Sequence, residues 1–599
     1  MISYASMSFR LLLATFLTTG LMPISAHSAP VLDVTVERGV KTTMRDGVVL
    51  RADIYRPKQE GRFPVLLQRT PYNKAGGADF GYRAASAGYV VIIQDVRGRY
   101  TSEGEWYPFQ FESNDGYDTV EWVAALPYAN GKVGMWGGSY VGATQMLAAI
   151  AHPPHLAGIC PVVTASNYHR NWAYQGGAFA QWFNQSWTSG LAQDTLNRRV
   201  QNETNAMTGV WQLPLQAYPL FNPHGNFGDP DSPASLAPYY LDWLAHPSMD
   251  AYWKRWSIED HYSEITVPAL HTAAWYDLFQ DGSLRNYQGI KRQGGTEAAR
   301  RGQHLLVIIG GHAGSGRHIG EVDFGPSAAE YSEAEVTLQW YDYLFKGVRN
   351  QFAQKPVRLF VMGANQWREE EDWPLKRAHS TKYFLHSSTG ANSLRGDGSL
   401  SAAPPGATEP ADRYVYDPTN PAPTTGGPLC CDANHLPGGP RDQRPVEARE
   451  DVLVYSTAAF TQEMEVTGPV KLDLYAKSSA VDTDFTAKLV DVWPNGFAQN
   501  LTEGIVRARY RDSQEKPELL NPQQVYRFTI ELWSTSNVFH PGHRLRLEVS
   551  SSNFPRFDRN LNTGRAAALE THATTATNTI LHDPEHPSTL LLPIVATAP

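Results

Sequence analysis

The chain has 599 residues, 42% of them hydrophobic, with 16 Trp, 29 Tyr and 23 Phe. That length exceeds what one hydrophobic core holds, so we expect roughly two to four domains in a globular protein rich in aromatic residues. The formal net charge of −9 at pH 7 argues against nucleic acid as a partner and leaves no basic face for an anionic membrane. The sequence carries no pattern that sets an oligomeric state.

The first residues read as a secretory signal peptide. Arg10 precedes the apolar run Leu11–Met22, and small residues follow up to Ala29. Such a run is too short to span a bilayer, and no later run approaches about 18 apolar residues. We therefore expect residues 1–29 to be removed, with cleavage between Ala26 and Ala29, and the mature protein to be exported without a membrane segment, to a periplasm or to the medium.

The next part of the chain alternates short apolar runs with helical patterns. FPVLLQ (Phe63 to Gln68) and YVVIIQ (Tyr89 to Gln94) are typical of strands buried on both faces. The same texture returns near VPALHTAAWYD and HLLVIIGGH. This alternation predicts a mainly parallel α/β sheet built from two parts of the chain, residues 30–164 and residues 266–350.

Two further regions of the chain differ from this pattern. Residues 165–265 are rich in Trp, Tyr, Asn and Gln, and we interpret them as a helical cap inserted into the α/β domain over its site. After about Asn350, strand-like runs such as VRLFVMG, VKLDLYAKS and YRFTIELW are separated by turn residues. That spacing predicts an all-β domain of jelly-roll type over residues 351–599. Within it, residues 400–445 form an irregular segment that we expect over the domain junction.

The segment KVGMWGGSYVGATQMLAA (Lys132 to Ala149) carries the strongest chemical signal. It predicts a strand, a sharp turn at Ser139 and a helix, with Gly137, Gly138 and Gly142 crowding the turn. A serine placed there projects its hydroxyl at the sheet edge, beside backbone N–H groups of a helix N-terminus. We interpret it as a nucleophile elbow; the alternative is a glycine-rich loop with an incidental serine.

A nucleophilic serine needs a base that a third group orients. In α/β-hydrolases the chain order is Ser, then Asp or Glu, then His. Asp277 ends PALHTAAWYD and His312 follows LLVIIGG, so both stand at carboxyl ends of predicted strands, where such sheets place their sites. Asp277 could instead cap the next helix. His318 competes with His312 in the same loop, whereas His304 precedes its strand at the wrong edge.

Several motifs in the right order resemble the X-Pro dipeptidyl-peptidase, cocaine esterase and α-amino acid ester hydrolase superfamily of serine hydrolases. The resemblance covers nearly all of the mature chain and implies an α/β-hydrolase fold with an inserted helical cap and a C-terminal jelly-roll domain. The motifs are RTPYNK, QDVRGRYTSEGEW, GGSYVG, AWYDLF, GGHAG, DQRPVEAREDVLVY and SSSNFPRFDRNLNTG.

The resemblance implies a role for each matching residue. Ser139 matches the nucleophile, Asp277 the acid and His312 the base. The hydroxyl of Tyr72 and the backbone N–H of Tyr140 match the donors of the oxyanion hole. No metal and no cofactor is required. The chain departs from the family in one place, because it has GGH where members commonly read G-P-W-x-H before the base.

The residues after Asp277 bear on the substrate. Phe279 and Gln280 stand where the α-amino acid ester hydrolases carry carboxylates for a substrate ammonium. The pattern W-Y-D-x-F resembles the esterase branch, in which Phe279 would line an acyl pocket together with Trp172 and Trp187. Such a pocket favours bulky or aromatic acyl groups. The alternative is that Trp172 and Trp187 are core residues of the cap.

We therefore expect a secreted serine hydrolase acting on a small-molecule ester or amide, or on a short peptide. Two alternatives stay open in the same family, an Xaa-Pro dipeptidyl-peptidase and an acylase. The alternative from a different class is a non-catalytic binding protein that uses its C-terminal domain as a lectin-like module.

The chain has three cysteines, Cys160, Cys430 and Cys431. This number is too small for a disulfide framework or a cysteine-based zinc site. The neighbours Cys430 and Cys431 allow a vicinal disulfide, but we expect two reduced, half-buried thiols.

Overall fold

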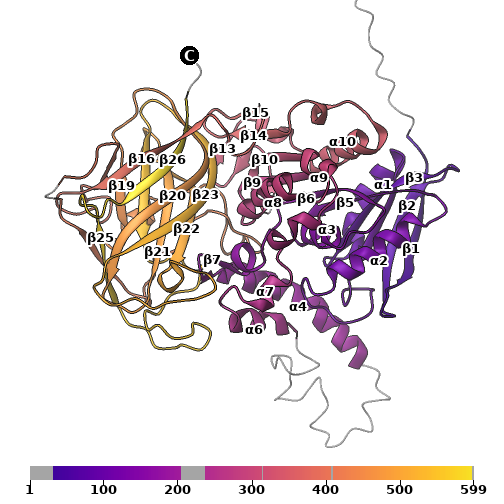
Figure 1. Ribbon diagram of the computed structural model, residues 1–599, viewed down its shortest axis with the longest axis horizontal. Coiled ribbons are helices and arrows are strands. Elements are labelled where there is room, and N and C mark those ends of the chain that lie inside the picture. Colours follow the sequence, from indigo (N-terminus) through magenta and orange to yellow (C-terminus); the bar gives the residue numbers. More distant parts are fainter. Residues whose placement is uncertain (1–30, 204–235, 313, 407–408, 597–599) are drawn as a thin grey trace, which may run out of the picture.

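The computed structural model describes residues 31–203, 236–312, 314–406 and 409–596, so the expected signal peptide lies outside the described residues. Figure 1 shows an α/β part formed by the first half of the chain and a β-rich part formed by the second half, side by side along the long axis. Helices α4, α6 and α7 lie on the lower side of the α/β part, next to the β-rich part. None of the described helices has the length and apolar character needed to cross a membrane.

The α/β part is built on one sheet with the strand order β1-β2-β4-β3-β5-β6-β9-β10-β14-β15. Neighbours from β4 to β14 pair in parallel, whereas β1, β2 and β15 join in antiparallel fashion. The parallel strands therefore end at one common edge. The strands are β1 (Val34–Thr43), β2 (Val49–Pro57), β3 (Phe63–Thr70), β4 (Val90–Asp95), β5 (Ala129–Gly138), β6 (Leu156–Val162), β9 (Ala269–Tyr276), β10 (Gln303–Gly311), β14 (Val357–Val361) and β15 (Gln366–Glu370).

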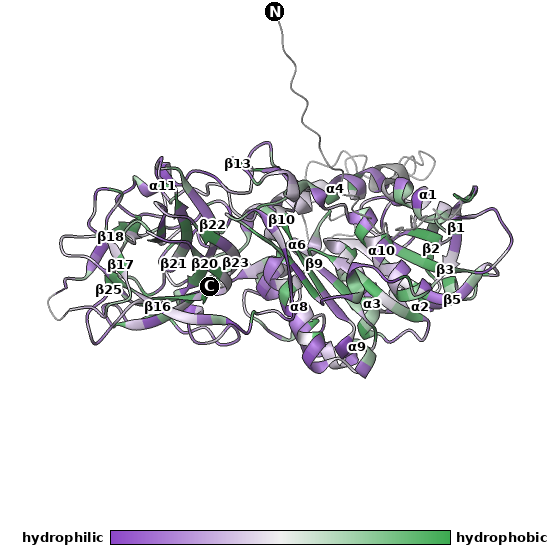
Figure 2. Ribbon diagram, turned by 90° about the horizontal axis from the view of Figure 1, so that it is seen from above, coloured by the Kyte–Doolittle hydropathy of each residue, from purple (hydrophilic) through white to green (hydrophobic). Residues whose placement is uncertain are grey.

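Helices cover both faces of this sheet, which leaves its apolar strands enclosed (Figure 2). On one face, α1 (Ala78–Ser86) and α10 (Glu333–Lys346) pack against the strands. The other face is covered by α2 (Glu112–Ala124), α3 (Tyr140–Ile150), α8 (Gln280–Gln293) and α9 (Glu297–Arg301). This is the α/β-hydrolase fold.

The sheet extends further along the chain than the sequence analysis expected. Val357–Val361, assigned there to the all-β domain, pairs in parallel with β10, and Gln366–Glu370 adds an antiparallel edge strand. These two strands follow the expected boundary between residues 350 and 351, yet they pair in the first sheet. An apolar strand pattern shows that a strand forms, but not which sheet accepts it.

Between β6 and β9, where residues 204–235 of the expected cap lie outside the described part of the chain, the described residues form helices and short extended elements over the carboxyl edge of the sheet. They are η2 (His169–Ala173), β7 (Tyr174–Gln175), β8 (Ala178–Phe179), α4 (Gln181–Glu203), α6 (Pro238–Ala245), α7 (Ala251–Lys254) and η5 (Glu259–Glu264). Their aromatic side chains join the core of the face that carries α2 and α3. We call these elements the cap.

The second part of the chain forms an 11-stranded sheet. Apolar side chains from many of its strands meet in one core, so the sheet folds over on itself as a β-sandwich. The same core continues into β9 and β10 of the first sheet. The strands are β16 (Ala378–His386), β17 (Ser399–Ser401), β18 (Asp412–Tyr416), β19 (Leu453–Ser456), β20 (Met464–Ser478), β21 (Asp484–Val492), β22 (Ala498–Arg507), β23 (Tyr526–Phe539), β24 (Arg544–Ser550), β25 (Ala576–Leu581) and β26 (Thr589–Val595).

The cap and the sandwich meet at a glycine. Gly176, between β7 and β8, has φ 55°, and a Cβ there would overlap the carbonyl oxygen of Ile505 in β22. The amide of Arg507 donates to the carbonyl of Gly176 at 2.8 Å. The backbones are thus too close for any side chain at this position.

We predict that Gly176→Ala lowers the free energy of unfolding by about 1–3 kcal/mol, because it adds a clash to a positive φ. Gly190→Ala is the control, since Gly190 lies in α4, where a Cβ would have no neighbouring atom within 4 Å, and alanine favours helix. Thermal unfolding of both variants measures the difference. Equal melting temperatures would contradict the close contact between the two backbones.

Candidate active site

Ser139 lies at the turn between β5 and α3. Its backbone has φ 61° and ψ −127°, a conformation that non-glycine residues seldom adopt and that is found at strained functional turns. Gly137 has φ 123°, and a Cβ there would overlap a methyl carbon of Val141. A Cβ on Gly142 would lie 2.7 Å from Cβ of Thr164. The turn is therefore sharp because its neighbours are glycine.

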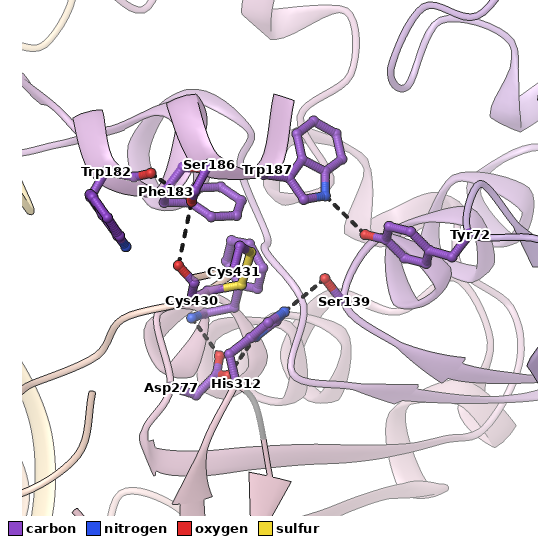
Figure 3. The surroundings of a disulfide bond; sticks show 11 residues. Tyr72, Ser139, Trp182, Phe183, Ser186, Trp187, Asp277, His312, Cys430 and Cys431 are labelled. Carbon is purple, nitrogen blue, oxygen red and sulfur yellow. Dashed lines mark hydrogen bonds and ion pairs between the residues drawn. A yellow bond between two sulfur atoms is a disulfide. The ribbon is translucent and has the colours of Figure 1, made fainter. Parts of the chain in front are cut away.

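His312 and Asp277 follow β10 and β9 and meet Ser139 at the carboxyl edge of the sheet (Figure 3). The His312 Nε2 atom lies 2.9 Å from the Ser139 Oγ, and its Nδ1 lies 2.7 Å from Asp277 Oδ2. Asp277 is fully buried, and its Oδ1 accepts a hydrogen bond of 2.6 Å from the amide of Phe279. Since Nδ1 faces a carboxylate it carries the ring proton, and Nε2 is left to accept the proton of Ser139.

The other histidines weighed from the sequence lie elsewhere. His318 is exposed in the short strand β12 (His318–Ile319), which pairs with β13 (Val322–Asp323). His304 lies at the opposite end of β10 from His312, where its Nε2 is 3.0 Å from the carbonyl oxygen of Phe352. Asp277 does not cap the following helix, because the N-cap of α8 is Phe279.

Tyr72 follows β3 and faces Ser139 from the other side (Figure 3). Its hydroxyl accepts a hydrogen bond of 3.0 Å from Nε1 of Trp187, on α4, and it also interacts with Ser139 and with the amide of Tyr140. Burial raises the pKa of Tyr72, against the opposing effect of these donors. The hydroxyl thus stays protonated near neutral pH, and because Trp187 supplies one bond, its own proton is free for another acceptor.

The side chain of Tyr140 anchors this edge of the site, which the sequence analysis did not anticipate. Its hydroxyl donates to Glu112 at 3.0 Å and accepts from the amide of Phe109 at 2.7 Å. Arg69, near the end of β3, binds the same Glu112 at 2.7 Å, and both are buried. This network ties the N-terminus of α3 to the strand before Tyr72. In the sequence, Arg69 of the RTPYNK motif was visible, but nothing there showed that it pairs with a residue of α2.

Four buried aromatic residues, here called the aromatic wall, form a series of ring contacts that begins at His312: Phe279, Trp172, Phe183 and Trp187. The Phe279 ring lies 5.2 Å from the His312 ring, and Trp172 stacks on Phe279 at 4.5 Å. Phe183 and Trp187 meet Trp172 edge-on at 5.4 Å. Trp172, Trp187 and Phe279 were expected near the site, whereas Phe183 was missed. Its ring pairs adopt favoured geometries, and with at most 5% of each residue exposed the wall is also part of the buried core of this face, as the alternative for Trp172 and Trp187 expected.

Cys430 and Cys431 are joined by a disulfide, so the expectation of two reduced thiols is wrong. The backbone of Cys431 has φ 82°, which turns its side chain toward that of its neighbour, and the sequence alone does not reveal such a conformation. Figure 3 shows the disulfide between Phe183 on α4 and the His312–Asp277 pair. Cys160 is free and buried.

Comparisons with known proteins agree with the division into an α/β-hydrolase domain and a C-terminal β domain. Residues 46–314 match the family model of X-Pro dipeptidyl-peptidase (S15 family), and residues 350–591 match that of the X-Pro dipeptidyl-peptidase C-terminal non-catalytic domain. Cocaine esterase of Rhodococcus sp. (strain MB1 Bresler) is 39% identical over 588 residues, which cover 94% of this chain and 98% of that protein.

Solved structures share the whole architecture. An α-amino acid ester hydrolase has 25% identity and a TM-score of 0.77, with 97% of this chain and 100% of that chain covered. An aminopeptidase from a marine sediment archaeon, Thaumarchaeota archaeon, has 24% identity, a TM-score of 0.79 and the same coverage.

The fold and these relatives define a serine hydrolase with an α/β-hydrolase domain and a C-terminal β domain. The chain belongs to the superfamily of X-Pro dipeptidyl-peptidases, cocaine esterases and α-amino acid ester hydrolases.

The geometry predicts that Ser139 reacts with a fluorophosphonate probe, because the hydrogen bond to His312 activates its hydroxyl. His312→Ala should slow labelling by about 10³-fold or more, whereas His318→Ala in the same loop should leave the rate unchanged. Gel fluorescence followed over time measures both rates. Equal slowing by the two substitutions would show that the loop, and not the ring of His312, is responsible.

Proposed function

We propose that this enzyme hydrolyses carboxylic esters of bulky or aromatic acids through an acyl-enzyme on Ser139, with His312 as the base and Asp277 as the group that orients it. The observation that carries the proposal is the unbroken hydrogen-bond series from Ser139 through His312 to the buried Asp277, beside an aromatic wall.

The proposed reaction has two halves. Ser139 Oγ attacks the ester carbonyl carbon while His312 Nε2 takes its proton, and Asp277 stabilises the imidazolium. The tetrahedral oxyanion accepts hydrogen bonds from the Tyr72 hydroxyl and the Tyr140 amide. Collapse expels the alcohol, which takes the proton from Nε2. Water then attacks the acyl-enzyme with the same proton transfers and releases the acid.

The acyl preference rests on the aromatic wall. Phe279 directly follows the Asp277–Leu278 turn and contacts the His312 ring, so an acyl group bonded to Ser139 has this wall as its neighbour. Flat, apolar acyl groups gain from stacking and from burial against such rings. We therefore propose that a benzoate ester is a better substrate than an acetate ester.

Cleavage of Xaa-Pro peptides is the second candidate, because the matched family model carries that description. It requires a carboxylate that binds the peptide's N-terminal ammonium. Gln280, close after Asp277, is instead held at both ends of its amide: it donates to the carbonyl of Trp275 and accepts from the amide of Ser534, each at 3.0 Å. Because Gln280 is used in this way and carries no charge for an ammonium, we favour an ester over an Xaa-Pro peptide as the substrate.

We also propose that the protein is exported. The support is the apolar run after Arg10 and the small residues up to Ala29, which match a cleavable secretory signal. Detection of the mature chain, beginning after Ala26 to Ala29, in the periplasm or the medium would test this proposal.

Tyr72→Phe should lower kcat for a p-nitrophenyl ester by about 10²-fold, the usual effect of removing one donor of an oxyanion hole. Ser139→Ala should lower kcat by about 10⁶-fold without changing the circular dichroism spectrum. Tyr82→Phe is the matched control, since Tyr82 is an exposed tyrosine on α1. Substantial turnover by the Ser139 variant would refute the mechanism.

A substrate panel tests the acyl preference. We expect kcat/KM to be higher for p-nitrophenyl benzoate than for the acetate, and an Xaa-Pro anilide to be the poorest substrate. Trp172→Leu should reduce the benzoate-to-acetate ratio by about tenfold, a usual penalty for lost apolar contact. Trp122→Leu, on α2, serves as the control. Faster cleavage of the anilide than of either ester would favour the peptidase instead.

A further inference from the structure

The Cys430–Cys431 disulfide lies within the proposed site rather than in a remote loop. Figure 3 shows it between α4, at Phe183 and Ser186, and the His312–Asp277 pair, across the site from Tyr72. The Ser186 hydroxyl contacts the carbonyl of Cys430 at 3.5 Å. The disulfide thus stands between the cap and the residues proposed to react.

Its side chains continue the aromatic wall. Cys430 is half-buried and packs against the core cluster that contains all four residues of the wall. The preceding Leu429 is buried and lines a cavity of about 30 Å³ together with Trp172 and Phe183. An acyl group that rests on the wall therefore has the disulfide as its next neighbour.

The segment that carries the disulfide is fixed at both ends. Gly427 and Gly439 exchange two backbone hydrogen bonds, of 2.8 and 2.9 Å. The amide of Glu321, in the loop after His312, donates to the carbonyl of Pro440 at 2.9 Å. We call residues 427–440 the strap. Between these fixed ends, the disulfide is the covalent constraint on the part of the strap that faces the site.

Reagents in solution can reach this bond. Cys431 is exposed, whereas Cys160, the cysteine outside the disulfide, is buried with 1% of its surface accessible. Cys431 also has φ 82°, a conformation that costs energy for a side chain with a Cβ. Once the bond to Cys430 is broken, nothing in the pair holds Cys431 there, and the strap can relax.

We propose that the Cys430–Cys431 disulfide is a reducible part of the acyl pocket, at which thiol–disulfide exchange with a dithiol sets how strongly the enzyme prefers aromatic acyl groups. This inference rests on the proposed ester hydrolysis.

The exchange is balanced. A thiolate of the dithiol attacks the sulfur of the exposed residue Cys431, the S–S bond breaks, and Cys430 leaves as a thiolate that takes up a proton. The second thiol of the reagent then attacks the mixed disulfide and releases the Cys431 thiol. The enzyme gains two thiols, and the reagent is oxidised to its disulfide.

The test compares the full-length enzyme before and after treatment with dithiothreitol under native conditions, with p-nitrophenyl benzoate and acetate as substrates. Mass spectrometry of the peptide that contains both cysteines follows the reduction. We expect the benzoate-to-acetate ratio of kcat/KM to fall by about fivefold as the bond opens, and to return on reoxidation.

Variants test whether the Cys430–Cys431 disulfide causes the change in this ratio. Cys160→Ala keeps the disulfide and should respond to dithiothreitol as the wild type does. The double variant Cys430→Ser with Cys431→Ser should show the low ratio at the outset and no response. Free thiols at both positions in the untreated enzyme, an unchanged ratio after complete reduction, or an equal response of the double variant would each overturn the proposal.

A different result would contradict the proposed ester hydrolysis itself. If the oxidised enzyme hydrolyses neither ester, the proposed function is wrong and the assignment of the disulfide falls with it. If both esters are hydrolysed at a ratio that ignores the redox state, the disulfide proposal alone is overturned.

Discussion

The site depends on one fully buried carboxylate. Burial of a charge is costly unless hydrogen bonds replace its water, and Asp277 receives one bond on each oxygen, from His312 and from the amide of Phe279. The first bond decides which nitrogen of the imidazole faces Ser139. The second holds the backbone that carries the Phe279 ring. A single group therefore orients both the imidazole of His312 and the Phe279 ring beside it.

Each part of the molecule contributes something that the others lack. The parallel strands bring their carboxyl ends to one edge, which collects Tyr72, Ser139, Asp277 and His312 from distant stretches of the chain. The cap supplies Trp187, whose indole sets the direction of the Tyr72 hydroxyl. The sandwich steadies β9, because the hydroxyl of Tyr276 donates to the carbonyl of Asn500 at 2.9 Å.

The sequence allowed the elbow and the strand ends to be predicted, since glycine spacing and short apolar runs are local signals. The placement of β14 was missed, because pairing with β10 is decided by tertiary contacts that leave no mark on VRLFV. Phe183 was missed for a related reason: α4 is a largely polar helix, and only its packing selects the face that meets Phe279. The pairing of Cys430 with Cys431 depends on a backbone angle that composition does not encode.

The part of the cap from Phe179 to Trp182 is hydrogen-bonded to the sandwich as well as packed on the core of the α/β part. The amide of Phe179 donates to Asp558 at 2.7 Å, and that of Trp182 donates to the carbonyl of Pro555 at 3.0 Å. Phe183 and Trp187, the residues of the aromatic wall on α4, directly follow this segment, so loops of the sandwich help to place them. Substitutions in those loops can therefore shift α4 and its aromatic rings without any change to Ser139, His312 or Asp277.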